Sequence, residues 1–173
     1  FECDDPFAPE HNLNLDVWVR ARPALTGLSA AQTSTDGEGL VTFAQILSSA
    51  DGLPCDMRIE YATHPEGPWL PVAVASAIAD HGVPLGPHER PPQITQVLTA
   101  REGMPIPNPI TAVWRTRDAI PPIGCETQVQ LRASAWNGYF MSPTVTSGAF
   151  QVDNVPPDGS AASFDFNLSS SGP

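Results

Sequence analysis

Proline and glycine interrupt this chain too often for long helices. The 173 residues include 20 prolines and 13 glycines. Proline removes a backbone donor and clashes with the preceding helical turn, and glycine raises the entropy cost of ordering a helix. Between these breakers, apolar and polar residues alternate in short runs, which is the period of a strand with one buried face. The sequence therefore predicts an all-β protein.

The strand-like runs are short and separated by turn signals. The clearest is "ETQVQLRASAW" (126–136), in which Val129, Leu131, Ala133 and Ala135 alternate with polar side chains. Other runs lie at 13–22, 23–32, 40–52, 56–63, 69–76, 93–100, 110–117 and 144–154, and residues 77–92 are predicted to form a long loop. Many short strands at this spacing predict an antiparallel β-sandwich, with a closed barrel as the second choice.

The charge balance argues against nucleic acid as a partner. The chain has eight basic residues, all arginine, and nineteen acidic ones, for a net charge of −11. A protein that follows phosphates needs a basic stripe, and none is present. No apolar run reaches the ~18 residues of a membrane span. The chain opens with "FECDDPFAPE", so we expect a mature chain from which any targeting segment has been removed.

Three segments resemble parts of a known type of module. They are "LVTFAQILSSADGLPCDMRIEYATHPEGPWLPV", "ITAVWRTRDAIPPIGCETQVQLRASAWNG" and the closing "SGAFQVDNVPP". In this order they are similar to the immunoglobulin-like or fibronectin type III-like modules of large bacterial secreted and surface proteins, over about residues 23–157. The resemblance implies an immunoglobulin-like sandwich that acts as a spacer, an adhesive unit or an assembly unit, without catalysis.

A module that ends at "VDNVPP" leaves strand-like segments on both sides. We expect an N-terminal arm with an extra strand (1–22), the sandwich (23–157) and a C-terminal strand (158–173). A lone strand with an apolar face is an aggregation hazard in water, so the C-terminal strand must pair somewhere. Its partner is the edge of its own sandwich or, by β-strand addition, the edge of a neighbour. Repeated head to tail, addition to a neighbour builds a filament.

The residues expected to make this contact alternate along both terminal segments. Phe164, Phe166 and Leu168 would fill the acceptor groove of the next subunit. The pairing edge would include four side chains of the N-terminal strand, Leu13, Leu15, Val17 and Val19.

The three cysteines predict an unusual pairing. Cys3, Cys55 and Cys125 lack CxxC spacing, which argues against zinc. An odd count fits one internal and one intermolecular bridge in an extracellular protein, or three reduced thiols in a cytosolic one. In an immunoglobulin-like strand order Cys55 and Cys125 lie roughly 20 Å apart, beyond the ~7 Å limit for bridged Cα atoms. Cys3 is therefore predicted to bond to a cysteine of another subunit or to Cys55.

Other candidate sites have weaker support. No G-x-S-x-G motif is present, and we expect no enzyme activity. A metal site from His81, His88 and Glu89 would require convergent geometry from a loop. Calcium is a weak candidate for two acidic clusters, for which solvated turns are the favoured interpretation: Asp153, Asn154 and Asp158, and Glu2, Asp4 and Asp5.

Aromatic side chains offer a second route to binding. Trp18, Trp69, Trp136 and Tyr139 would form a stacking platform for sugars if they are exposed. Trp114 and Trp69 fit better in the sandwich core.

From the terminal strands, the first prediction is a subunit of an extracellular or cell-surface filament that polymerises with itself through strand exchange. The alternative is a carbohydrate- or calcium-binding adhesion module of a larger surface protein, with cell-surface glycans as partners.

Overall fold

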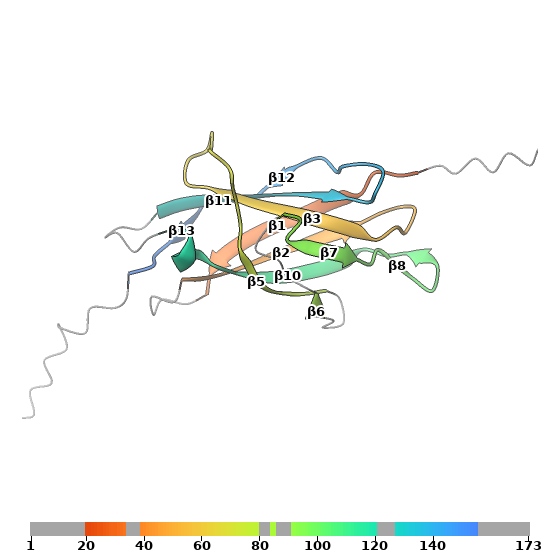
Figure 1. Cartoon of the computed structure of the whole chain (residues 1–173), viewed down its shortest axis with the longest axis horizontal. Coiled ribbons are helices and arrows are strands. Elements are labelled where there is room, and N and C mark those ends of the chain that lie inside the picture. Colours follow the sequence, from red (N-terminus) through yellow and green to blue (C-terminus); the bar gives the residue numbers. More distant parts are fainter. Residues whose placement is uncertain (1–19, 34–38, 80–83, 86–90, 121–126, 156–173) are drawn as a thin grey trace, which may run out of the picture.

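The described part of the chain forms two antiparallel sheets packed face to face and a separate two-stranded hairpin (Figure 1). The structure is a computed structural model that describes residues 20–33, 39–79, 84–85, 91–120 and 127–155. The prediction of an antiparallel β-sandwich is therefore confirmed. The predicted strand-like extensions lie outside the described residues, except for Arg20 to Arg22, which are not in a strand.

The strands are short except for β1, β2, β3, β10 and β11. In chain order they are β1 (Ala24–Gln32), β2 (Leu40–Ser48), β3 (Cys55–Ala62), β4 (Leu70–Pro71), β5 (Val74–Ile78), β6 (Pro84–Leu85), β7 (Ile94–Val97), β8 (Ala100–Arg101), β9 (Met104–Pro105), β10 (Asn108–Arg115), β11 (Thr127–Trp136), β12 (Val145–Thr146) and β13 (Phe150–Val152). One 3-10 turn, η2 (Thr116–Asp118), follows β10.

The strand order is that of an immunoglobulin constant-type domain. One sheet has the order β1-β2-β10-β5-β6, and the other has the order β12-β11-β3-β4, with β13 also paired to β11 and β7 to β3. The first four strands of the first sheet correspond to A-B-E-D, and β3, β11 and β12 with β13 correspond to C-F-G. The fold therefore agrees with the strand order expected for an immunoglobulin-like sandwich.

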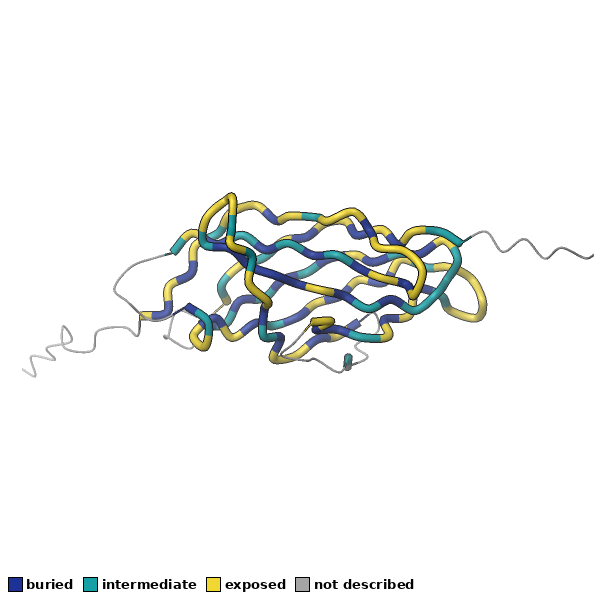
Figure 2. The backbone as a smooth tube through the Cα atoms, turned by 45° about the horizontal axis from the view of Figure 1, so that its top comes forward, coloured by how far each residue is buried: buried dark blue, intermediate teal, exposed yellow. Residues whose placement is uncertain are grey.

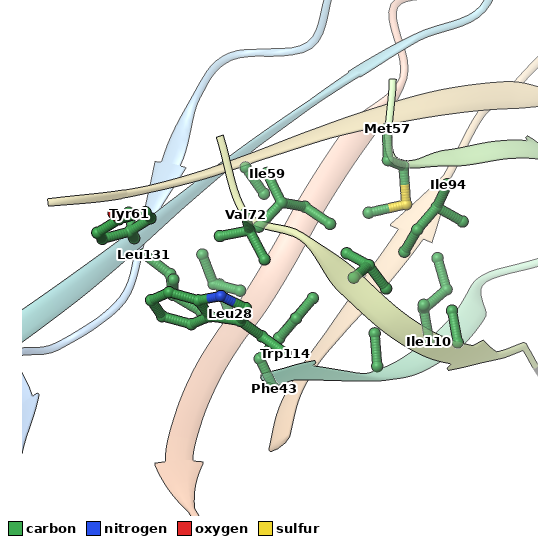
Figure 3. Close-up of a cluster of buried hydrophobic side chains, with 14 of the residues drawn as sticks. Leu28, Phe43, Met57, Ile59, Tyr61, Val72, Ile94, Ile110, Trp114 and Leu131 are labelled. Carbon is green, nitrogen blue, oxygen red and sulfur yellow. The ribbon is translucent and has the colours of Figure 1, made fainter. Parts of the chain in front are cut away.

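The core lies between the two sheets because each long strand turns alternate side chains inward. Figure 2 shows buried and exposed residues alternating along these strands. Trp114 of β10 is fully buried, and its ring lies 4.7 Å from that of Tyr61 of β3 (Figure 3). Met57, Ile59 and Leu131 are also fully buried around this centre. The predicted place of Trp114 in the core is confirmed.

One segment predicted to be a loop contains strands, since residues 77–92 include the end of β5 and all of β6. A hairpin of β8 and β9 then lies between Ala100 and Pro105. Glu102 and Gly103 connect that hairpin with φ values of 52° and 80°. Positive φ at both central positions suits the right-handed twist of a two-residue hairpin. The sequence signal was missed because Glu replaces the usual Asn or Asp before the glycine.

A buried glutamine completes the edge of β3. β4 and β7 pair with opposite ends of β3, and Gln93 lies beside the gap between them. The Gln93 side chain accepts a hydrogen bond from Ile59 N at 2.9 Å and donates one to Ile59 O at 2.8 Å. Its carboxamide therefore satisfies the same backbone groups that a paired strand would.

We predict that Gln93→Leu destabilises the fold. The substitution removes both bonds to Ile59 and leaves a buried N–H unpaired, which costs about 1–3 kcal/mol. Urea unfolding followed by circular dichroism measures the loss. Gln128→Leu, at an exposed position of β11, is the matched control and should change the free energy of unfolding by less than about 0.5 kcal/mol. Equal stability of the two variants would contradict the role of Gln93.

Candidate functional site

The chain enters and leaves the sandwich at opposite ends. β1 begins beside the end of β2, since Ala24 pairs with Ser48. β13 ends beside the start of β11, since Val152 pairs with Thr127. Because β11 runs antiparallel to β3, the start of β11 lies far from Cys55 at the start of β3. We call the two ends the N-terminal end and the C-terminal end (Figure 1).

The point where the chain enters is held by Asp51 and Asn137. Ala21 N donates to Asp51 Oδ2 at 3.1 Å, and Asn137 Nδ2 donates to Ala21 O at 2.8 Å. Burial disfavours the Asp51 charge, but hydrogen bonds from Ser49, Ala21 and Leu53 lower the pKa of this carboxyl below its ordinary value. The anchor is therefore charged at neutral pH.

The point where the chain leaves is held by Asn154. Its Oδ1 accepts a hydrogen bond from Thr116 Oγ1 at 2.8 Å, and its Nδ2 donates to Ile120 O at 2.7 Å. The backbone N–H of Thr116 donates to Gly39 O at 2.7 Å. Asn154 is only 3% exposed, so this candidate calcium ligand has both ends of its carboxamide bonded within the fold.

Side chains fill the gaps along both edges of the second sheet. Gln93 closes the edge of β3, as described above. On the other side, Ser142 Oγ accepts from Ala135 N at 2.8 Å, and Ser147 Oγ accepts from Leu131 N at 3.0 Å. These hydroxyls accept hydrogen bonds from backbone N–H groups of β11 at positions where neither β12 nor β13 pairs with it. Both long strands of this sheet, β3 and β11, therefore have hydrogen-bonding partners along their outer edges.

The edge of the first sheet at β1 is different. β1 has nine residues, and among the described strands it pairs only with β2. Its end is tied to β13 through Gln32, whose Oε1 accepts from Asp153 N at 2.7 Å and whose Nε2 donates to Asp153 O. Before Gln32, the outer edge from Ala24 to Ala31 has no strand partner among the described residues. A bulge between Thr26 and Ser29 bends this edge.

The outer face of the second sheet has an ion-pair network beside an aromatic ring. Glu60 Oε2 is 2.7 Å from Arg132 Nε, and Glu60 Oε1 is 2.6 Å from Arg58 Nη2. The Arg132 guanidinium lies 4.5 Å from the centre of the Trp69 ring. Trp69 is therefore half-buried on this outer face, and its predicted place in the core is wrong.

A groove crosses the same face near the N-terminal end. It has a volume of about 340 Å³ and is lined by Asp56, Arg58, Pro91, Pro92, Ser134, Trp136 and Met141. Trp136 is 46% exposed and Tyr139, in the following loop, is 59% exposed. Both belong to the predicted stacking platform, whereas Trp18 lies outside the described residues.

The described residues include few of the other predicted site residues. Phe164, Phe166, Leu168, Leu13, Leu15, Val17 and Val19 all lie outside them, as do Cys3, Cys125, Asp158, His81, His88 and Glu89. Asp153 is described and exposed, and its Oδ1 accepts from Val155 N at 2.9 Å. Within the described ranges, no group of three or more His, Cys, Asp or Glu side chains is placed to hold a metal. The terminal strand and calcium sites stay predictions.

Cys55 is a free and fully buried thiol in the structure. Its Sγ lies 3.5 Å from Leu53 O. The N-terminal end also holds the start of β1, so the residues before β1 enter the fold near Cys55. A bridge to Cys3, one of the two predicted pairings, would require the Cys55 sulfur to become accessible.

Comparison with protein-family models, curated proteins and solved structures finds no significant match. The family resemblance of the three segments therefore stays a prediction. In the described part of the chain, no helix is long and apolar enough to cross a membrane.

The side chains that complete the strand edges carry no recognisable signal in the sequence. Gln32, Gln93, Ser142 and Ser147 are single polar residues in or beside predicted strands, and no local pattern distinguishes them from solvent-facing ones. The proline pair at 91–92 directly before Gln93 marks a break between strands, and it is the one local signal of a gap to be filled.

We predict that Cys55 does not react with iodoacetamide in the native protein at pH 8. Burial, followed by the negative charges of Asp51 and Asp56, raises the pKa of the Cys55 thiol to about 11. Only roughly a thousandth of it is then the reactive thiolate. Peptide mass spectrometry after labelling, with and without urea, measures the modification at this position. Rapid labelling of native Cys55 would contradict its burial.

We also predict that Glu60→Gln reduces stability above pH 4.5 and has less effect in acid. Burial disfavours the Glu60 charge, but Arg132 and then Arg58 lower its pKa below the ordinary 4.5. The contribution is therefore complete above pH 4.5 and is lost as the pH falls through the pKa of the folded state. We expect a loss of about 1–2 kcal/mol at pH 7 in urea unfolding. Glu66→Gln, at an exposed turn, is the control and should change the free energy of unfolding at pH 7 by less than about 0.5 kcal/mol.

Proposed function

We propose that this chain is a structural subunit of an extracellular or cell-surface filament, assembled by β-strand exchange. The observation that carries the proposal is the outer edge of β1, which has no strand partner among the described residues from Ala24 to Ala31. An extended segment adds to such an edge through backbone hydrogen bonds, and alternate side chains give specificity. Because β3 and β11 are bonded along both sides, β1 has the longest unpaired edge among the described strands.

The terminal segment supplies a strand of suitable pattern. Phe164, Phe166 and Leu168 alternate with polar residues and act as the donor, and Leu13, Leu15, Val17 and Val19 extend the pairing edge. Leu25 and Leu28 of β1 are buried in the core at 6% and 8% exposed, slightly more than the fully buried Val41 and Leu47 of β2. Donor side chains beside β1 would cover the surface that remains exposed.

The direction of assembly follows from the two ends. A strand that leaves one subunit at its C-terminal end and joins the next near β1 makes a heterologous contact, in which two different surfaces meet. Because the entry and exit of the chain lie at opposite ends of the sandwich, repetition of this contact adds subunits head to tail, and it builds a filament when the rotation between subunits does not close a ring. Pairing of the strand within its own chain is the competing arrangement.

Deletion of residues 160–173 is expected to abolish assembly and leave a soluble fold. Light scattering and negative-stain microscopy measure assembly, and circular dichroism measures the fold. When a peptide of residues 158–173 is added to the shortened chain, amides of β1 should gain protection from hydrogen exchange. Filaments from the shortened chain, or protection elsewhere, would contradict the proposal. A full-length chain that is monomeric at all concentrations and already protected at β1 would indicate pairing within one chain.

A pair of substitutions separates the donor face from general effects of the tail. Phe166→Asp places a charge on the apolar face and should prevent assembly, whereas Asn167→Asp adds the same charge on the polar face and should permit it. Loss of assembly in both variants would point to charge and not to strand packing.

The second candidate is an adhesion module that binds carbohydrate. The groove beside Trp136 favours it, because an exposed indole offers a stacking surface and Asp56, Arg58 and Ser134 offer polar groups around it. Glycan-array binding by monomeric protein that disappears in Trp136→Ala would support this function. Calcium-dependent melting would support a calcium-binding module.

A further inference from the structure

Large hydrophobic side chains gather at one end of the molecule. Among the described residues, ten such side chains are markedly exposed, and six of them belong to the N-terminal end: Leu98, Met104, Trp136, Tyr139, Phe140 and Met141. Figure 1 shows the β11–β12 connection and β8 at the end where β1 begins. Exposed apolar surface of this kind, concentrated in one place, marks an interaction site.

The most prominent of these side chains are held in a fixed loop. Asn137 Oδ1 accepts hydrogen bonds from Tyr139 N at 3.1 Å and Phe140 N at 2.9 Å. Gly138, between Asn137 and Tyr139, has a φ of 90°, which favours glycine. The Arg20 guanidinium lies 4.7 Å from the Tyr139 ring centre, and that of Arg22 lies 5.9 Å from Phe140. Tyr139 is thus a preorganised aromatic side chain, 59% exposed at the tip of the loop.

A pocket of matching chemistry lies at the C-terminal end. It has a volume of about 220 Å³ and is lined by Tyr61, Thr63, Pro68, Leu70, Ala119 and Ile120. Tyr61 packs on Trp114 and its hydroxyl donates to Ala119 O at 3.4 Å, which fixes the inner wall. The pocket is mostly apolar and large enough for one aromatic ring. Along the β3–β11 ladder, Trp136 pairs with Asp56 and the pocket begins at Tyr61, roughly 15–20 Å away by strand rise.

We propose that Tyr139 of one copy inserts into this pocket of the next copy. The occupant is a second copy of this chain, because the aromatic loop and the pocket lie at opposite ends of one molecule and cannot meet within it. A surface knob and a pocket elsewhere on the same molecule form a heterologous contact that does not close, and such contacts build fibres. This inference deepens the proposed filament, on which it rests, by adding a side-chain contact separate from strand exchange.

Local charge supports the same pairing. Arg20 and Arg22 flank the aromatic rings of the loop. Beside the pocket, Glu66 lies in the turn between Thr63 and Pro68, and Asp118 directly precedes Ala119; both are exposed, as is Arg117. Acidic side chains therefore accompany the pocket of one copy, and arginines accompany the aromatic loop of the other. Because the chain carries a net charge of −11, local opposite charges help two copies approach.

A photo-crosslinking experiment on the full chain tests the contact. The probe is p-benzoylphenylalanine incorporated at position 139, which keeps an aromatic ring in the loop. After irradiation, mass spectrometry should find intermolecular cross-links at the pocket, chiefly at Leu70 and Ile120. The matched control carries the same probe at position 78, where Ile78 is 46% exposed on β5, and should give no cross-links to the pocket. Cross-links from position 139 that avoid the pocket would overturn the inference.

Substitutions give a second, independent measurement. Tyr139→Asp and Leu70→Arg, at two exposed positions, should each weaken association by at least about tenfold in sedimentation, as expected for an interface hot spot. Asn137→Ala keeps both aromatic rings but releases the loop, so it should weaken association less than Tyr139→Asp. Ile78→Ser should leave association unchanged. Unchanged association in both Tyr139→Asp and Leu70→Arg would overturn the inference.

The outcomes distinguish the two proposals. If the full chain assembles, assembly depends on residues 160–173 and the cross-links avoid the pocket, strand exchange stands and the knob contact fails. If the cross-links lie in the pocket but deletion of residues 160–173 leaves assembly unchanged, the knob contact stands and strand exchange fails. If the full chain stays monomeric at every concentration, both fail.

Discussion

Every strand edge in this sandwich must satisfy its backbone hydrogen bonds, and most of the strands are too short to do so by pairing alone. β4 and β12 have two residues each and β13 has three, yet they flank β3 and β11, which have eight and ten. Side chains supply the missing partners: Gln93 for Ile59, Ser147 for Leu131 and Ser142 for Ala135. Since an unpaired buried backbone group is costly, these few side chains allow a proline-rich chain to keep two complete long strands.

The same constraint explains why β1 is exceptional. Gln32 uses its carboxamide on Asp153 in the way that Gln93 uses its own on Ile59, with both the N–H and the C=O of one residue engaged. That contact ties the last residue of β1 to the segment that follows β13. The preceding edge has no strand partner among the described residues other than β2, and natural sheets limit such edges by bulges and flanking proline. Pro23 and the bulge after Thr26 are devices of this kind, and they restrict the edge to a partner of suitable twist.

The sequence predicts the fold class, but it does not predict which side chains complete the strand edges. Alternation in β11 and the spacing of proline and glycine predict antiparallel sheets, because burial on one face imposes a period of two on each strand. The roles of Gln93 and Ser142 depend on which backbone groups remain unpaired after the strands have assembled, and no local pattern encodes that. Trp69 shows the same limit: its size predicts a core position, but the charge of Arg132 stabilises the ring on the outer face. Tyr139 was predicted to be part of a sugar-stacking platform from its aromatic side chain alone, and the sequence does not show the pocket at the C-terminal end.

The entrance of the chain and the aromatic loop share a hydrogen-bonding centre. Asn137 holds Ala21 O through its amide and shapes the loop through its carbonyl, while Asp51 holds Ala21 N. A displacement of the residues before Ala21 therefore acts on Asn137, the same side chain that orients Tyr139. If a donor strand binds along β1, which begins three residues later, it approaches this centre as well. The two proposed contacts would then be coupled through Asn137, and strengthening one would favour the geometry of the other.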